Sequence, residues 1–346
     1  MGKKKISIIG AGVVDILVGA VDEKIFSRSS TSADFIKFSF GGDALNEAIV
    51  LSRLGKNVQW ISNVGDDDAG KRILNYAEEN NLSVDCIKVQ AGLETSITIV
   101  LVDARGERYF LTNPRGSMRK LSEEDIAPHI DGLGEIVCLA SMFISPLLDI
   151  AATERIFRKI KSRPRILAFD MKEPTSDAPL ENNFAATERI LAFDATRPKN
   201  GETLKDLATI LSYADYFFPN EEELATLTGS DDLYKNIDSL LDCGLKCAVV
   251  KRGGDGCIIA TKNERLEIPA CHVEKVVDTT GAGDCFAAGF LYALSEDWPL
   301  AECGKFACAV ASCSVEEVGA VAGVTSLEKV LQRYERSISF DKTFRH

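Results

Sequence analysis

The sequence of 346 residues lacks the features of a membrane, nucleic-acid-binding or zinc protein. No apolar run reaches the ~18 residues that a membrane-spanning helix requires. Its 40 Lys and Arg residues are outnumbered by 52 Asp and Glu residues, and a net charge of −12 offers no cationic footprint for nucleic acid or an anionic membrane. With 3 histidines and no Cys-x-x-Cys pair, a zinc site is disfavoured. We therefore expect no nucleic-acid and no membrane partner.

The sequence also lacks the paired cysteines of a secreted protein. Its 10 cysteines are scattered singly, which is typical of reduced thiols buried as small apolar groups and indicates a cytoplasmic protein. The basic start, residues 1–5, leads into an apolar stretch, but Asp15 interrupts that stretch and no clean cleavage site follows. We interpret residues 6–9 as a first strand rather than as part of a signal peptide.

What the sequence does contain is an alternation of short apolar runs and helix-length segments. Continuous apolar runs predict strands covered on both faces, at residues 6–9, 58–62, 136–140, 166–169, 216–218, 248–250 and 257–260. The intervening segments predict helices, at 45–54, 70–80, 151–161, 202–212 and 326–336. This alternation predicts an α/β fold, a three-layer α/β/α sandwich with a mostly parallel central sheet, as a single domain over residues 1–346.

One segment predicts a second, small β-sheet. Residues 95–102 and 108–112 flank a polar turn, as in a β-hairpin. Together with the segment 34–40 and the apolar residues 87–89, they predict a lid built from about 34–40 and 86–112. Such a sheet on an α/β body is a candidate lid or dimer surface.

The sequence repeats itself irregularly in the middle. AATERI occurs at 151–156 and 185–190, and RILAFD at 165–170 and 189–194. The two offsets, 34 and 24 residues, exclude a regular repeat protein. Either Asp170 or Asp194 could end the sheet strand, and the polar stretch 171–184 predicts a surface insertion.

Gly10-Ala11-Gly12 after the first strand begins like a dinucleotide-binding loop. Asp15 stands where the third glycine is needed for helix–strand packing, so a nicotinamide site is disfavoured. A carboxylate at the end of a strand can instead accept hydrogen bonds from two hydroxyl groups of a polyol. The ordinary structural interpretation of Asp15 is a solvated loop carboxylate.

A second glycine motif opens the first predicted helix. Gly41 and Gly42 allow a backbone to approach a ligand closely, and Asn46, one turn into the helix, could point at the same ligand. Asp43 is a candidate ligand-binding residue, although it could serve as an N-cap. In the middle of the chain, Asn220 and Glu223 belong to PNEEE, which is either an acidic first helical turn or an oxygen-rich site for hydrated Mg²⁺.

The strongest motif is DTTGAGDCFAAGF at 278–290. Small residues open a helix whose free N–H groups bind anions, and Asp284 lies in its first turn. An anion site with a carboxylate beside it suits phosphoryl transfer, because the carboxylate can accept a hydroxyl proton. The glycine turn that follows Lys251 could cover nucleotide phosphates, but alone it is only a hairpin. The residues of P-loop and protein-kinase chemistry are missing.

Together, GGDALNEA at 41–48, PNEEE at 219–223 and DTTGAGDCFAAGF resemble the signatures of the ribokinase, or PfkB-type, carbohydrate kinase family. The resemblance covers about residues 5–335 and is strongest to poorly characterised bacterial sugar kinases. It implies an α/β/α sandwich of nine or so strands with a β-lid, ATP as co-substrate, Mg²⁺, a possible K⁺ and a homodimer formed through the lid.

The resemblance also implies roles for individual residues. Asp284 is the catalytic base, and Gly281, Ala282 and Gly283 form the anion hole. The remaining roles are sugar binding by Asp15, Gly41, Gly42, Asp43 and Asn46; nucleotide binding by Lys251, Gly253, Gly256 and Asn220; Mg²⁺ binding through water by Asn220 and Glu223; and K⁺ binding by Asp278 and Thr280. Cys308 stands where many members carry an adenine-pocket Asn. Family spacing to Asn220 favours Asp194 over Asp170.

The sequence analysis thus predicts an ATP-dependent kinase of a small nonphosphorylated sugar or sugar acid. Asp15 and Asp43 would repel a phosphorylated substrate, and Arg115 could reach a sugar-acid carboxylate, although a solvated loop arginine is an equal interpretation. A nucleoside kinase of the same fold, or a non-catalytic sugar- or nucleotide-binding protein, remains an alternative.

Overall fold

The computed structural model describes residues 4–103, 105, 107–163, 165–166 and 186–343. Its central sheet has nine strands in the order β15-β14-β13-β12-β11-β8-β1-β4-β5. Neighbouring strands from β13 to β5 pair in parallel, whereas β13, β14 and β15 form an antiparallel meander at one edge. The strands are β1 (Lys5–Ile9), β4 (Asn57–Gly65), β5 (Ile87–Gln90), β8 (Ile136–Met142), β11 (Ile190–Ala195), β12 (Tyr216–Phe217), β13 (Cys247–Lys251), β14 (Cys257–Ala260) and β15 (Arg265–Ile268).

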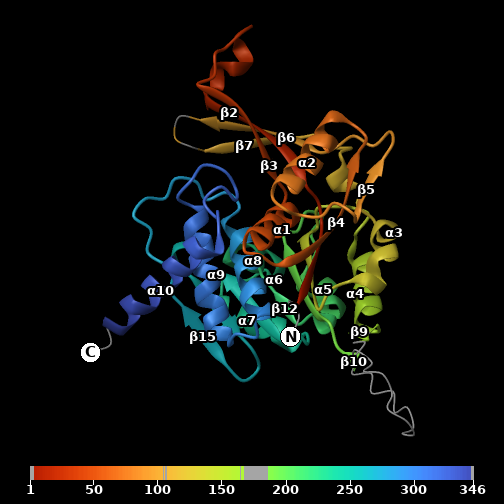
Figure 1. Cartoon of the computed structure of the whole chain (residues 1–346), viewed down its shortest axis with the longest axis vertical. Helices are drawn as coiled ribbons and strands as arrows, with labels where there is room; N and C mark the ends of the chain where they lie inside the picture. Colours follow the sequence, from red (N-terminus) through yellow and green to blue (C-terminus); the bar gives the residue numbers. More distant parts are fainter. Residues whose placement is uncertain (1–3, 104, 106, 164, 167–185, 344–346) are drawn as a thin grey trace, which may run out of the picture.

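Helices cover both faces of this sheet (Figure 1). Because side chains alternate along a strand, Ile6 and Ile8 of β1 enter one apolar core and Ile9 enters the other. The first core packs against α1 (Asp43–Arg53), α2 (Asp68–Glu79), α8 (Ala282–Ser295), α9 (Leu300–Ser314) and α10 (Leu327–Thr343). The second packs against α3 (Glu123–Ile126), α4 (Ile150–Lys161), α5 (Leu204–Tyr213), α6 (Glu221–Thr228) and α7 (Leu233–Asp242). The predicted three-layer α/β/α sandwich is confirmed.

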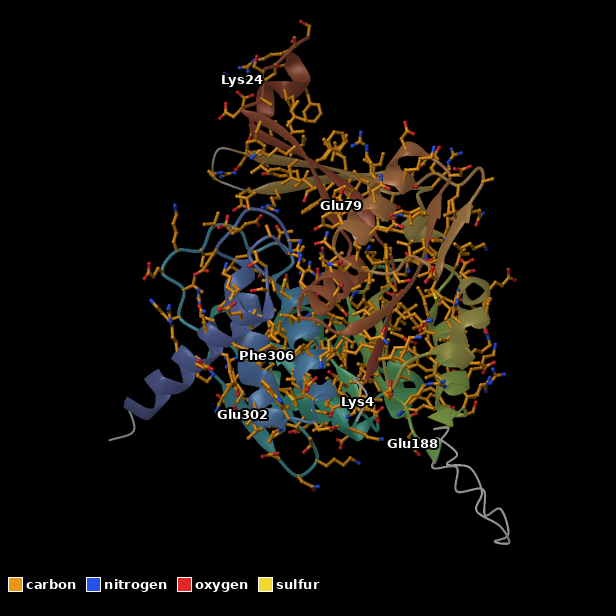
Figure 2. All side chains as sticks on the ribbon, viewed as in Figure 1. Lys4, Lys24, Glu79, Glu188, Glu302 and Phe306 are labelled. Atoms are coloured by element: carbon orange, nitrogen blue, oxygen red, sulfur yellow. The ribbon has the colours of Figure 1, made fainter. Side chains whose placement is uncertain are left out.

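A separate four-stranded sheet, the lid, has the order β3-β2-β6-β7. Its strands are β2 (Val13–Val21), β3 (Phe35–Gly41), β6 (Ile97–Asp103) and β7 (Arg108–Thr112). Figure 1 shows it at the upper end of the molecule, and Figure 2 shows Lys24 at its outer tip, far from Phe306 in the helical body. The predicted hairpin is confirmed, because β6 and β7 pair antiparallel.

Two predictions about strands near the lid are wrong. Residues 87–89 do not join it, because β5 pairs in parallel with β4 at the edge of the central sheet. Asp15 does not follow a strand end; it lies inside β2, which continues from β1 into the lid after the Gly10–Gly12 turn. Short apolar runs do not reveal which of two sheets a strand joins.

Strand pairing shows which copy of the repeated RILAFD sequence lies in the central sheet. Asp194 lies in β11, which pairs in parallel with β8 and β12, so the prediction that favoured it is confirmed. The first copy begins with β9 (Arg165–Ile166), which pairs with β10 (Ala186–Thr187) in a two-stranded sheet of its own. Asp170 and the predicted insertion 171–184 lie outside the described residues.

Two further observations bear on the excluded classes. Within the described ranges, none of the helices has both the length and the apolar character needed to cross a bilayer. All 10 cysteines carry free thiols, and most are buried.

Candidate active site

The glycine-rich turn before α8 forms the floor of the site. Gly281 is the N-cap of α8 with a φ of 69°, and a Cβ there would lie 2.6 Å from Cβ of Ala320, so only glycine fits. A helix leaves its first N–H groups without intrahelical acceptors. The N–H of Ala282 donates to the Thr279 carbonyl at 3.2 Å. The N–H groups of Gly281, Gly283 and Asp284 are therefore the candidates for an anion hole.

A lysine from the central sheet stands beside this turn. Lys251 ends β13, and its Nζ lies 3.4 Å from where a Cβ on Gly283 would be. The same Nζ donates to Asp194 Oδ2 at 2.6 Å, and both side chains are buried. Burial would lower the pKa of Lys251, but the carboxylates of Asp194 and Glu223 outweigh burial and raise it. The turn therefore faces a permanent ammonium group.

The carboxylate of Asp284 is tied to the first helix of the chain. Asn46 Nδ2 donates to Asp284 Oδ2 at 2.7 Å, which joins the GGDALNEA helix to the GAGD turn. Burial, reinforced by the negative charge of Asp43, raises the pKa of Asp284 to about 8, against the opposing hydrogen bond from Asn46 and the charge of Lys251. A carboxyl group with a pKa in this range can accept a proton near neutral pH.

Beneath Asp284 lies a carboxyl group that sequence analysis did not single out. Glu47 of α1 is fully buried, and neither of its carboxyl oxygens meets a geometric hydrogen-bond donor among the described residues, although the Cys138 thiol lies beside it. Burial raises the pKa of Glu47 well above its ordinary value, and the charges of Asp194 and Asp284 act in the same direction. Its surroundings therefore favour the protonated, neutral form of Glu47.

The start of α1 brings the predicted sugar-binding residues together. Asp43 is the first helical residue rather than the N-cap, and its Oδ2 accepts a hydrogen bond from Ser141 Oγ at 2.7 Å. Gly42 has a φ of 92°, and a Cβ there would meet the Ala11 carbonyl at 2.6 Å. Ser141, at the end of β8, is itself in the left-handed region with a φ of 62°. Non-glycine residues held in this region cluster at functional sites.

Asp15 reaches the same place from the lid. A Cβ on Gly41 would lie 2.3 Å from Asp15 Oδ2, so the glycine makes room for the carboxylate. Burial raises the pKa of Asp15 to about 7, and the charge of Arg108 opposes this rise. Asp15, Gly41, Gly42, Asp43 and Asn46 thus lie together, next to the turn that carries Asp284.

Asn220 and Glu223 form a reciprocal capping box at the start of α6. Asn220 Oδ1 accepts from the N–H of Glu223, and Glu223 Oε2 accepts from the N–H of Asn220, both at 2.8 Å. A β-bridge joins Asn220 to Lys251. In the described ranges, no three His, Cys, Asp or Glu side chains are grouped so as to hold a metal ion. Glu223 Oε1 lies outside the capping box, and a carboxylate oxygen fits a hydrated Mg²⁺, which needs few protein ligands.

The remaining nucleotide-site residues differ in placement. Gly253 and Gly256 flank the turn between β13 and β14, and a Cβ on Gly256 would collide with the Ile268 carbonyl at 2.0 Å. Cys308 of α9 is buried against Cys257 of β14, and this hydrogen-bonded contact together with burial raises its pKa. The thiol packs as a small core group, so nothing in these contacts singles it out for adenine.

Two cations near Asp43 were missed from the sequence. Burial and the charge of Arg119 lower the pKa of Lys199, while Asp43 opposes them, so the three groups are near one another. Nε of Arg119 is buried and has no hydrogen-bond partner among the residues that the structure describes. The signal was weak, because single cations in polar loops are common. Arg115, which was predicted instead, is exposed in the turn after β7.

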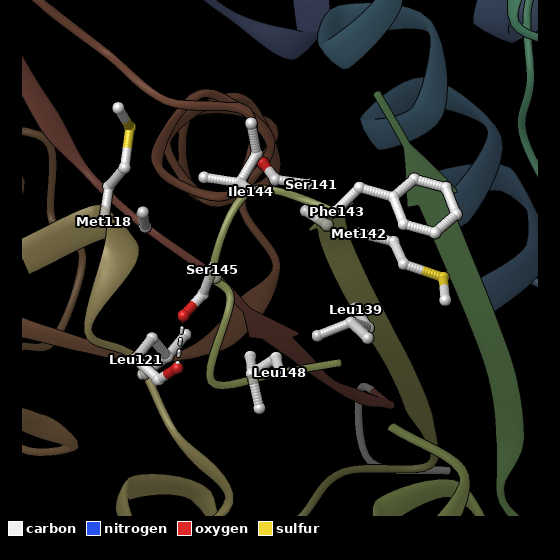
Figure 3. Close-up of a pocket in the computed structure, with 12 residues that line it drawn as sticks. Met118, Leu121, Leu139, Ser141, Met142, Phe143, Ile144, Ser145 and Leu148 are labelled. Carbon is white, nitrogen blue, oxygen red and sulfur yellow. Dashed lines mark hydrogen bonds between the residues drawn. The ribbon is translucent and has the colours of Figure 1, made fainter. Parts of the chain in front are cut away.

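An apolar pocket opens beside these groups. It is lined by Gly10, Ala11 and Met118 and by the strand end from Leu139 to Ser145 (Figure 3). Ser145 Oγ donates to the Leu121 carbonyl at 2.7 Å, the dashed line in Figure 3. Because Ser141 also binds Asp43, the pocket continues from the predicted sugar-binding residues.

Comparison with known proteins finds relatives over most of the chain. The model for "pfkB family carbohydrate kinase" matches residues 3–327. An uncharacterized sugar kinase of Archaeoglobus fulgidus is 28% identical over 79% of this chain and 97% of its own length. A nucleoside kinase of Methanocaldococcus jannaschii is 24% identical over 97% of this chain and 99% of its own. The structure of Arabidopsis thaliana ribokinase with ribose and ATP superposes with a TM-score of 0.78 at 21% identity, covering 96% of this chain and 99% of that one.

Proposed function

Because the chain belongs to the PfkB family of carbohydrate kinases, and is therefore an ATP-dependent kinase, we propose that it phosphorylates a small nonphosphorylated sugar or sugar acid, with Asp284 as the base. The observation that carries this proposal is the 2.7 Å hydrogen bond between Asn46 and Asp284. It brings the polyol-binding residues of α1 to the anion-binding turn of α8, so an acceptor hydroxyl and a phosphate can meet there.

In this mechanism Asp284 accepts the proton of the hydroxyl that attacks the γ-phosphate of ATP. Asp15, Asp43 and Asn46 bind the other hydroxyl groups and orient the acceptor, which converts binding into a favourable geometry for transfer. Negative charge on the moving phosphoryl group is met by the N–H groups of the turn and by Lys251. The lid would exclude water and so limit hydrolysis of ATP.

The residues for a metal are those of the capping box. We assign Glu223, with Asn220 beside it, to a hydrated Mg²⁺ that accompanies ATP. When bound, Mg²⁺ neutralises charge on the phosphates. Gly253 and Gly256, in the turn after Lys251, are assigned to the nucleotide. Free thiols and the use of ATP support a cytoplasmic location.

The substrate class follows from the charges around Asp43. Asp15 and Asp43 favour hydroxyl groups, and Arg119 with Lys199 favours an anionic group at the far end of the substrate. We therefore propose sugar acids and neutral sugars equally as acceptors. We assign the carboxylate of a sugar acid to Arg119 and Lys199 rather than to Arg115.

A nucleoside kinase is the second candidate function. A nucleoside needs an apolar slot for its base, and the apolar pocket beside Ser141 lies next to Asp43, but its cavity of about 20 Å³ would have to widen to admit a base. The pocket favours an apolar group on the substrate, whereas Arg119 and Lys199 favour an anionic one. A nucleoside would leave Arg119 without a charged partner.

The experiment is coupled ADP release with Mg²⁺ over a panel of neutral sugars, sugar acids and nucleosides. We expect turnover with sugars or sugar acids, and turnover lower by about 10²- to 10⁴-fold in the Asp284→Asn variant. If a sugar acid is the substrate, Arg119→Gln raises its KM about tenfold or more, the size of a lost charged hydrogen bond, and Arg115→Gln, the matched control, does not. Turnover of nucleosides alone contradicts the sugar proposal. Sugar binding without ADP release from any acceptor contradicts the assigned chemistry.

A further inference from the structure

The lid reaches the phosphate-binding turn through one arginine. Arg108, the first residue of β7, places its Nη2 2.6 Å from Asp278 Oδ1, and its Nη1 donates to Thr280 Oγ1. The Arg108 side chain is 23% exposed and that of Asp278 is 2% exposed. Asp278 and Thr280 are the two residues that the family resemblance assigns to a monovalent cation.

The carboxylate of Asp278 is already surrounded by donors. Oδ1 accepts from the N–H of Thr280 and Oδ2 from the N–H of Gly319, each at 2.9 Å. With the guanidinium of Arg108, three donors from the protein thus meet the Asp278 carboxylate.

A guanidinium and a K⁺ ion cannot share this place. Arg carries five N–H donors and no acceptor, stays charged at every physiological pH and offers no oxygen to a metal ion. The group sits where a cation bound by Asp278 and the hydroxyl of Thr280 would have to sit. The residues present do not fit a K⁺ site while Arg108 is paired.

We propose that Arg108 supplies, from the lid, the positive charge that other members of the family take from a monovalent cation, so that this kinase is independent of K⁺. The assignment rests on the proposed role of Gly281–Asp284 as the phosphate-binding turn. Asp278 stabilises that turn in two ways. The carbonyl of Thr279, the residue after Asp278, accepts the N–H of Ala282. Asp278 also accepts the N–H of Gly319, whose neighbour Ala320 packs against Gly281.

The pairing also couples the lid to the turn. Arg108 lies on the same face of the lid sheet as Asp15. It pairs with Val102 of β6, which pairs with Gly19 of β2, and Asp15 lies four residues before Gly19 on that strand, so its side chain points the same way. The same guanidinium thus attracts the carboxylate of Asp15, a proposed substrate-binding residue, and forms an ion pair with Asp278 of the turn. When the lid takes the position seen here, Asp278 gains a positive partner, whereas Asp15 belongs to the same sheet as Arg108 and keeps that partner in any position of the lid.

The test compares wild type with Arg108→Gln, and uses Arg105→Gln as the matched control. Arg105 lies on the same hairpin but is exposed and pairs with Asp103 at 3.0 Å. The melting temperature of each protein is measured without substrate in potassium chloride and in tetramethylammonium chloride at equal ionic strength. We expect no difference between the salts for wild type and Arg105→Gln, and a higher melting temperature in potassium for Arg108→Gln, since K⁺ can then bind the Asp278 carboxylate that has lost its guanidinium partner.

Activity gives the second readout, once a substrate is known. The kcat/KM of wild type should be the same in both salts, and Arg108→Gln should lose about tenfold or more in tetramethylammonium and regain part of that loss in potassium. If Arg108→Gln does not fold, Arg108→Lys keeps the charge and is expected to stay insensitive to potassium. A wild type that melts higher in potassium, or an Arg108→Gln variant that behaves like Arg105→Gln, overturns the proposal. Failure to phosphorylate any sugar contradicts the proposed function only, because the melting test needs no substrate.

Discussion

Carboxyl groups around the candidate active site hold protons more tightly than free Asp or Glu. Asp15 and Asp194 have pKa values raised to about 7, Asp284 to about 8, and Glu47 well above its ordinary value, in each case chiefly because burial disfavours the charged form. Pairs of such groups are typical of sites that move protons. The protonation of these groups should therefore affect both activity and stability.

Asp284 sets the expected pH dependence of activity. A base must be ionised to accept a proton, so kcat/KM should rise about tenfold per pH unit below the pKa of about 8 and level off above it. Asp284→Asn should lower kcat by about 10²- to 10⁴-fold with little loss of folding. Both are measured by ADP release as a function of pH; near-normal turnover of the variant would show that another group is the base.

Glu47 sets an expected pH dependence of stability. Its folded pKa lies above its unfolded value, so the folded state binds the proton more tightly and the stabilisation is lost as pH rises above the unfolded value of about 4.5. Glu47→Gln cannot ionise, so its melting temperature should exceed that of wild type increasingly as pH rises. Glu79→Gln, at the exposed end of α2, is the control that should follow wild type (Figure 2). Parallel melting curves for all three proteins would contradict the prediction.

At the scale of elements, the start of α8 separates folding from catalysis. Gly281 and Gly283 belong to one turn but meet different surroundings. Gly281 is left-handed and packed against Ala320, whereas a Cβ on Gly283 would only make ordinary contact with Lys251. The two glycines therefore allow a matched pair of variants.

Gly281→Ala should lower stability, because a left-handed alanine costs about 1–2 kcal/mol before the clash with Ala320 is added. Gly283→Ala should keep or slightly raise the melting temperature, since alanine in a helix is favoured over glycine by about 0.5–1 kcal/mol. It should nevertheless lose ATP turnover, because its methyl group occupies the space between the anion hole and Lys251. Melting curves and ADP release decide, and full activity of Gly283→Ala would move the phosphate site elsewhere.

For the whole molecule, the lid presents an unpaired apolar face. Strand register places Ile36 and Phe38 of β3 on the same face as Ile99 of β6 and Tyr109 and Leu111 of β7. Each is exposed, Phe38 at 58%, whereas Asp15 and Arg108 lie on the opposite face. A contiguous apolar surface of this kind marks a protein-binding site. We propose that a second copy of the chain covers it.

The expected assembly is a homodimer that depends on this face. Phe38→Ser should shift the protein to monomer in sedimentation analysis, because it removes a large apolar contact from the patch. Lys37→Ser, one residue away on the other face of β3, should leave the dimer intact. A monomeric wild type, or a dimer that Phe38→Ser does not weaken, would contradict the proposal.

Much of the fold could be predicted because it is encoded locally. Continuous apolar runs identify β4, β8, β13 and β14 as strands buried on both faces, and the glycine motifs at 41–42 and 281–283 mark where backbone must approach backbone. The sequence analysis did not predict β2 as a strand, and it could not assign β5 to the correct sheet, because periodicity reports burial and not the partner strand.

The sequence by itself determined the fold class and the chemical identity of the candidate site, because burial patterns and turn residues act over a few neighbours. Only the tertiary structure decided which charges meet. Asn46 and Asp284 are 238 residues apart, and Arg108 reaches Thr280 across 172 residues. Such contacts depend on crossover connections and on the path of β2 into the lid, which no local pattern records. That is why the sequence suggested a K⁺ site where the folded chain places an arginine.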